Sequence, residues 1–112
     1  LSHPVPPDEP ARLAALARYG VLDTPPEPAY DDLARLAAII CGVAMAHVSF
    51  MDAGRQWLKA VAGADAGMLA RDIPRPSAFC AWPVATGELL VVPDAHLDPR
   101  FAAHQPGELA MP

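Results

Sequence analysis

The sequence predicts a small α+β domain in which two helices come first and an antiparallel hairpin follows. Apolar residues recur at the helical period over residues 29–41 and alternate at the strand period over residues 44–52. The length points the same way, because 112 residues suffice for one hydrophobic core and are too few for two domains. We therefore expect a single folding unit.

The first helix is predicted over residues 9–19. Asp8 is a suitable N-cap, Pro10 fits a first helical turn, and Gly20 fits the left-handed residue that ends a helix. Residues 1–8 are rich in proline and are expected to form a disordered leader before the domain of residues 9–112. The prolines of residues 23–28 then exclude helix interior and predict a rigid joint.

The second helix is predicted over residues 29–41 and ends at Gly42, again a residue suited to left-handed geometry. Its apolar positions recur at spacings of three and four, which predicts that they form the buried face. These positions are Tyr30, Leu33, Leu36, Ala37 and Ile40.

Residues 44–52 are predicted to form a strand with Ala46, Val48 and Phe50 on one face and the residues between them on the other. Residues 52–55 carry turn-forming residues, so a β-hairpin is expected. The returning strand, residues 56–61, is predicted to place Trp57 and Lys59 on one face, opposite Leu58 and Ala60.

The rest of the chain gives weaker signals. Residues 62–76 lack periodicity and are expected to be a loop or a short irregular turn. Residues 89–92 predict a short strand, and Asp98 with Pro99 predicts the start of a short helix that carries Phe101.

Composition excludes several classes of protein. Thirteen acidic and eight basic side chains give a formal net charge of -5, and the basic residues are scattered, so no nucleic-acid partner is expected. Apolar runs fall far short of the roughly 20 residues that cross a membrane, and no signal peptide is visible. We expect a cytoplasmic protein without membrane insertion. Two cysteines without paired spacing predict reduced thiols.

Cys80 is the one side chain with a case for chemistry. Pro83 is tolerated only in the first turn of a helix, so a helix that runs toward Gly87 must start near residues 77–82. Cys80 then lies at a helix N-terminus, which favours the reactive thiolate. The alternative is a small buried hydrophobe between Phe79 and Trp82.

Other candidate residues have simpler explanations. Cys41 at a helix end is expected to pack in the core, and Asp94 and Asp98 are expected to be turn and cap residues rather than metal ligands. No metal site, phosphate loop or catalytic triad is predicted. Four aromatic side chains could line a ligand pocket or belong to the core: Phe50, Trp57, Phe79 and Trp82.

Six short motifs in order resemble the GAF domain, in the version found at the N-terminus of bacterial sensor histidine kinases and diguanylate cyclases. The motifs are Leu22-Asp-Thr-Pro-Pro-Glu27, a helix, Val48-Ser-Phe-Met-Asp52, Arg55-Gln-Trp57-x-Lys59, Ser77-x-Phe-Cys80 and Val91-Val-Pro-Asp94-x-x-x-Asp98-Pro-Arg-Phe101. They span about residues 9–102.

The resemblance implies a GAF-like antiparallel sheet flanked by helices, which holds a small-molecule ligand and signals as a homodimer to an output kinase or cyclase domain in cis. It leaves the cofactor unknown, because this family reads cyclic nucleotides, tetrapyrroles, haem and small organic acids. The chain departs from the family twice: Trp82 stands where a histidine is usual, and the last central strands are absent, so a fragment is expected.

We therefore expect a non-catalytic sensory or regulatory domain of a bacterial signal-transduction protein, with Cys80, Phe79, Trp82, Trp57 and Phe50 as ligand-pocket candidates. One alternative is a thiol redox enzyme of the methionine sulfoxide reductase kind that depends on Cys80. Another is a ligand-free dimerisation module.

Overall fold

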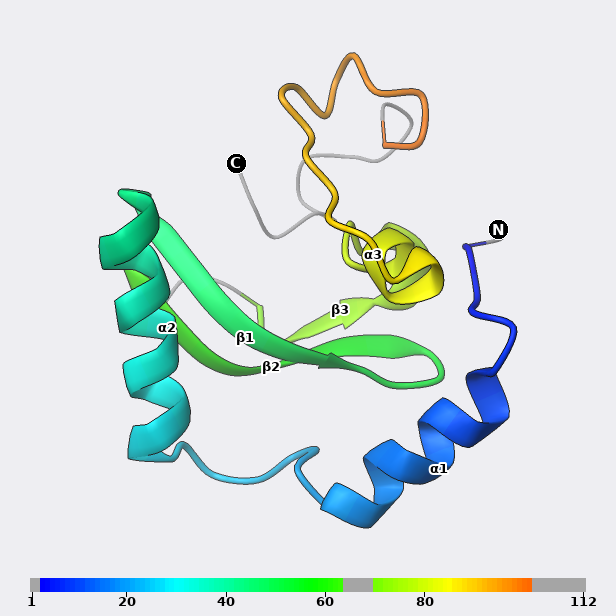
Figure 1. The fold of residues 1–112 in the computed structure, drawn as a ribbon, viewed down its shortest axis with the longest axis horizontal. Helices are drawn as coiled ribbons and strands as arrows, with labels where there is room; N and C mark the ends of the chain where they lie inside the picture. The colour runs from blue at the N-terminus through cyan, green and yellow to red at the C-terminus, as the bar shows by residue number, and fades with distance from the viewer. Residues whose placement is uncertain (1–2, 64–69, 102–112) are drawn as a thin grey trace.

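The computed structural model describes residues 3–63 and 70–101. Two helices precede a β-hairpin, a third short strand and a third helix (Figure 1). The elements are α1 (Glu9–Tyr19), α2 (Pro28–Cys41), β1 (Met45–Met51), β2 (Arg55–Gly63), β3 (Asp72–Pro74), the 3₁₀ turn η2 (Arg75–Ser77) and α3 (Ala81–Thr86). The α+β class, both long helices and the hairpin are confirmed.

The strands form one antiparallel sheet in the order β1-β2-β3. Helices α1 and α2 pack on one face of the sheet, and α3 packs on the other face (Figure 1). Strand β3 lies in a segment that was expected to be a loop. The strand is only three residues long, which is too short for a hydrophobic period to appear in the sequence. Pairing with β2, in which Gln56 faces Ile73, gives this segment its extended form.

Glycine ends both long helices as predicted. Gly20 and Gly42 have φ angles of 60° and 62°, the left-handed region in which glycine is least strained. Their backbone N–H groups donate to carbonyl oxygens in the last helical turn, including that of Ala17 in α1. The helix bounds are therefore fixed by local backbone chemistry.

A β-bulge reverses the alternation of side chains in the second half of β2. Val48 pairs with Ala60 and Ser49 pairs with Leu58, so Lys59 is the extra residue. Lys59 and Ala60 consequently face the same side, and Ala60 packs against Ala34 of α2. The prediction that Ala60 shares a face with Leu58 was wrong, because the bulge shifts the period by one residue.

Helix α2 meets the sheet through a different face from the one predicted. Ala34 is fully buried against Ala60 and Ala62, whereas Leu33, Leu36 and Ile40 are exposed. The small side chains let the helix approach the strands closely, and the larger apolar residues point away from the sheet. The predicted buried stripe was therefore wrong apart from Tyr30, which packs beside the same alanines.

Two elements were predicted near the end of the described chain, a strand over residues 89–92 and a helix after Asp98. Residues 89–92 make no strand in the described part, and Leu89 is exposed, because no neighbouring strand satisfies their backbone. Residues 99–101 form a turn, in which the Asp98 carboxylate accepts a hydrogen bond from the backbone N–H of Arg100. Asp98 thus has the predicted capping chemistry, and the rest of the predicted helix lies outside the described residues.

The connector between α1 and α2 is fixed to β2 by buried polar contacts. The Lys59 ammonium, whose side chain is wholly buried, donates to Thr24 Oγ1 and to the Pro25 carbonyl oxygen, both at 2.6 Å. It also pairs with Glu27 Oε2 at 2.6 Å and lies over the rings of Tyr30 and Trp57. A buried cation therefore ties the proline-rich joint to β2.

Arg55 makes a second link between the same two segments. Its guanidinium donates two hydrogen bonds to the Asp23 carboxylate, at 2.9 and 2.6 Å, and a third to Asp72 at 2.5 Å. Arg55 Nε also lies 3.8 Å from the Asp52 carboxylate in the hairpin turn. The motif of residues 22–27 and the motif of residues 55–59 are therefore the two halves of one clamp.

Candidate functional site

A half-open pocket of about 600 Å³ lies beside α3, between the start of that helix and the segment that follows it. One wall is formed by Phe79, Cys80 and Pro83. The other is formed by the segment of residues 90–96, from which Leu90, Val92, Pro93, Asp94, Ala95 and His96 line the pocket. Most of this lining is apolar, so the pocket suits a ligand with an apolar body.

The wall around Cys80 is anchored in the core on the face of the sheet that α3 covers. Ala78 and Ala81, on either side of Phe79 and Cys80, are buried against Leu58 and Ile73. Cys80 is the N-cap residue of α3, as Pro83 predicted. The pocket wall is therefore held by the packing of α3 on the sheet.

The environment of Cys80 favours the thiol over the thiolate. Burial raises the pKa of Cys80, and a hydrogen bond with the Gln56 side chain opposes this rise only in part. Of the two interpretations left open for Cys80, the reactive thiolate is the less favoured, because burial disfavours the charged form of the thiol. The buried-hydrophobe interpretation is closer, since Cys80 packs at the edge of the core.

Cys41 is exposed at the end of α2, so the prediction that it packs in the core was wrong. The residue belongs to the last turn of a helix whose sheet-facing side is defined by Ala34. Both cysteines are free thiols, as expected for a reduced protein. A high thiol pKa at Cys80 is unfavourable for an attacking thiolate, and this weakens the case for a redox enzyme.

A polar row crosses the sheet next to Cys80. Gln56 is buried, and its Nε2 donates to Ser49 Oγ at 2.8 Å. His47 lies further along β1 on the same face, since residues 47, 49 and 51 alternate with the face that carries Phe50. His47 Nδ1 is buried without a hydrogen-bond partner among the described residues, and burial lowers the pKa of this imidazole.

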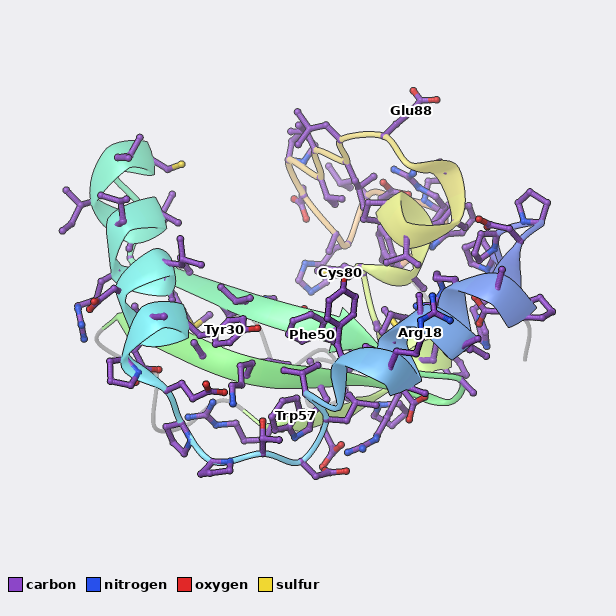
Figure 2. All side chains as sticks on the ribbon, turned by 60° about the horizontal axis from the view of Figure 1, so that its bottom comes forward. Arg18, Tyr30, Phe50, Trp57, Cys80 and Glu88 are labelled. Carbon is purple, nitrogen blue, oxygen red and sulfur yellow. The ribbon has the colours of Figure 1, made fainter. Side chains whose placement is uncertain are left out.

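The five residues predicted to line a ligand pocket lie in three places. Phe79 and Cys80 line the large pocket. Trp82 lies outside it, at a smaller hollow, with the Arg100 guanidinium 5.3 Å from its ring. Phe50 and Trp57, which Figure 2 labels together with Cys80, belong to the cluster on the opposite face of the sheet. There Trp57 packs with Leu16 and Val21 of the α1 region.

Asp94 and His96 also line the pocket, although the sequence did not indicate either residue as part of a site. The Asp94 carboxylate accepts a hydrogen bond from the backbone N–H of His96 at 2.9 Å and lies 3.4 Å from His96 Nδ1. Asp94 has the turn role that its sequence context predicted. The sequence motif of residues 91–101 contains Asp94 and could have pointed to a functional role. Only the folded chain shows that this turn forms a pocket wall.

The fold and the pocket define a small α+β domain with an apolar cavity over one face of an antiparallel sheet. No family model matches the chain. The chain is 33% identical over 98 residues to the cyclic di-GMP phosphodiesterase PA2567 of Pseudomonas aeruginosa. The match covers 88% of this chain and 16% of that protein, so the chain spans about one sixth of the length of the relative.

Within the described residues, no helix is long and apolar enough to cross a membrane.

Proposed function

We propose that this chain is a sensory domain of the GAF type, which binds a small and mainly apolar molecule in the pocket beside Cys80. The observation that carries the proposal is the pocket itself, because its volume of about 600 Å³ falls within the range of small-molecule sites. The six motifs of the sequence, the α+β fold and the similarity to a bacterial signalling protein support it.

The lining suggests the character of the ligand. Phe79, Pro83, Leu90 and Val92 offer apolar contacts and few hydrogen bonds. Among the lining residues, the side chains with polar or ionisable groups are those of Cys80, Asp94 and His96. A ligand with an apolar body and one hydrogen-bonding end would match this distribution.

The domain is non-catalytic in this proposal. Catalysis resides in an output domain of the same protein, for which the resemblance suggests a kinase or a cyclase and the relative suggests a phosphodiesterase. The domain changes the activity of that output domain when the pocket is filled, and it works within a homodimer.

The test is to purify the protein from its own host and to record its native mass and absorption spectrum beside those of two variants. Ala95→Trp fills the pocket, whereas Val91→Trp is a matched control at an exposed position outside the pocket lining. We expect extra bound mass in the natural protein and in Val91→Trp, and its loss in Ala95→Trp. A bare chain mass, or bound mass that Ala95→Trp retains, would contradict the proposal.

A further inference from the structure

The N-terminal half of α1 is tied to the segment that leads into the pocket wall. Glu9 accepts hydrogen bonds from Arg12 Nε at 2.6 Å and from Arg75 Nη1 at 2.5 Å. Arg12 also donates to the Met51 carbonyl oxygen at 2.5 Å. Helix α1 is thus joined through two arginines to the end of β1 and to η2.

Arg75 is held in the interior with only part of its hydrogen-bonding capacity used. Its side chain is 1% exposed. Within the described residues, its side-chain hydrogen bonds all leave from Nη1, to Glu9 and to the carbonyl oxygens of Asp52 and Ala53. Nε and Nη2 are buried without partners among the described residues. A buried guanidinium with unused N–H donors destabilises the folded state, so a small displacement of residue 75 can be enough to break its pairing with Glu9.

The chain from Arg75 to the pocket is short and continuous. The Ala78 N–H donates to the Arg75 carbonyl oxygen at 3.1 Å, and Phe79 and Cys80 follow at once as pocket wall. At its own backbone N–H, Arg75 is bonded to the Gly54 carbonyl oxygen in the hairpin turn. Residues 75–81 therefore connect the pocket to the carboxylate of Glu9.

The other end of α1 has a separate attachment. Leu16 and Val21 pack against Trp57 on the face of the sheet opposite the pocket. Helix α1 accordingly has an apolar anchor near its C-terminus and a polar anchor near its N-terminus. A shift of residues 75–81 would alter the polar anchor while the apolar anchor stays in place.

We propose that the Glu9–Arg75 pair is a latch that couples occupancy of the pocket beside Cys80 to the docking of α1. This inference rests on the proposed function only in taking the pocket as the place where the signal enters. When the wall formed by Phe79 and Cys80 moves, Arg75 withdraws from Glu9 and the first turns of α1 separate from the sheet. Energetic coupling between two sites is reciprocal, so release of α1 also loosens the pocket wall.

The test uses N-ethylmaleimide as the probe, in a Cys41→Ser background so that Cys80 is the only thiol. Its addition to the Cys80 sulfur places a compact group at the pocket wall and needs no natural ligand. Hydrogen exchange of the backbone amides is measured before and after modification. We expect protection of the α1 amides to fall roughly fivefold or more, with the α2 amides unchanged.

The reverse direction is tested by the rate at which the same reagent modifies Cys80. Glu9→Gln weakens the latch and keeps a hydrogen-bond acceptor, and it should raise this rate roughly fivefold or more. Asp32→Asn is the matched control, because it removes the carboxylate of an exposed pair with Arg35 on α2 that does not involve Arg75. This control should leave the rate unchanged.

Equal modification rates in the two variants, or α1 protection that modification leaves unaltered, would overturn the coupling. Protection lost equally from α1 and α2 would also overturn it, since that pattern is general destabilisation. Because the reagent replaces the natural ligand, the latch can be supported when no bound molecule is found in the purified protein. Conversely, a bound molecule with no effect on α1 would support the proposed function and refute the latch.

Discussion

Replacing Lys59 with methionine should release the connector between α1 and α2 and destabilise the domain. Methionine keeps most of the buried stem but removes the ammonium that bonds Thr24 and Pro25 and pairs with Glu27. The Lys59 side chain is 0% exposed, whereas Glu27 is 54% exposed. Glu27 can therefore turn to water in the variant, but the Pro25 carbonyl oxygen loses its partner.

The size of the effect follows from these contacts. A hydrogen bond from a charged donor contributes about 1.5–3 kcal/mol, and Lys59 makes two to the connector. Removing a buried ammonium recovers part of its desolvation cost, and the exposed Glu27 partner adds little. We expect Lys59→Met to lower the free energy of unfolding by about 2–4 kcal/mol.

Urea denaturation of the natural protein and the variant measures this change, provided that the free energy of unfolding falls with urea concentration at the same slope in both proteins. Arg35→Met is the matched control, because it removes an exposed cation whose partner is Asp32 and should cost less than about 1 kcal/mol. Equal losses in the two variants, or a loss below about 1 kcal/mol for Lys59→Met, would refute the clamp.

Two further predictions concern α1 and the sheet. Arg12 and Arg75 lower the pKa of Glu9 from 4.5 to about 2, so the stabilisation by its carboxylate is complete above pH 4.5 and is lost as the pH falls toward 2. Thermal unfolding should show Glu9→Gln less stable than the natural protein at pH 7 and nearly equal to it near pH 2; a pH-independent difference would contradict this. Gly63 has a φ of 130°, and a side chain there would collide with the Ala44 carbonyl oxygen, so Gly63→Ala should cost more than about 1 kcal/mol. Gly54→Ala meets open space and is the control, and similar urea midpoints for the two variants would count against the geometry.

Much of the candidate site depended on contacts between distant segments. The sequence placed Cys80 at the start of a helix, because the position of Pro83 is a local constraint. It could not place residues 90–96 opposite Phe79, since that depends on how the segment after α3 folds back. The same limit explains why Phe50 and Trp57 were grouped with Phe79, although they lie across the sheet from it.

The raised pKa of Cys80 shows the same dependence on tertiary structure. A helix N-terminus can be inferred from neighbouring residues, but burial depends on what packs over the thiol. Here Cys80 packs against the cluster around Leu58, and this burial raises the pKa of its thiol. The predicted location at the start of α3 was confirmed, and burial favours the interpretation of Cys80 as a small buried hydrophobe over that of a thiolate.

The sequence by itself determined the features that neighbouring residues control: the ends of α1 and α2 at Gly20 and Gly42, and the alternation of β1. Backbone sterics and side-chain period act over a few residues, so they can be read locally. Tertiary structure alone decided the bulge at Lys59, the buried face of α2 and the pairing of Glu9 with Arg75. Each of these depends on which distant surface an element meets, because burial and close packing are properties of the assembled chain.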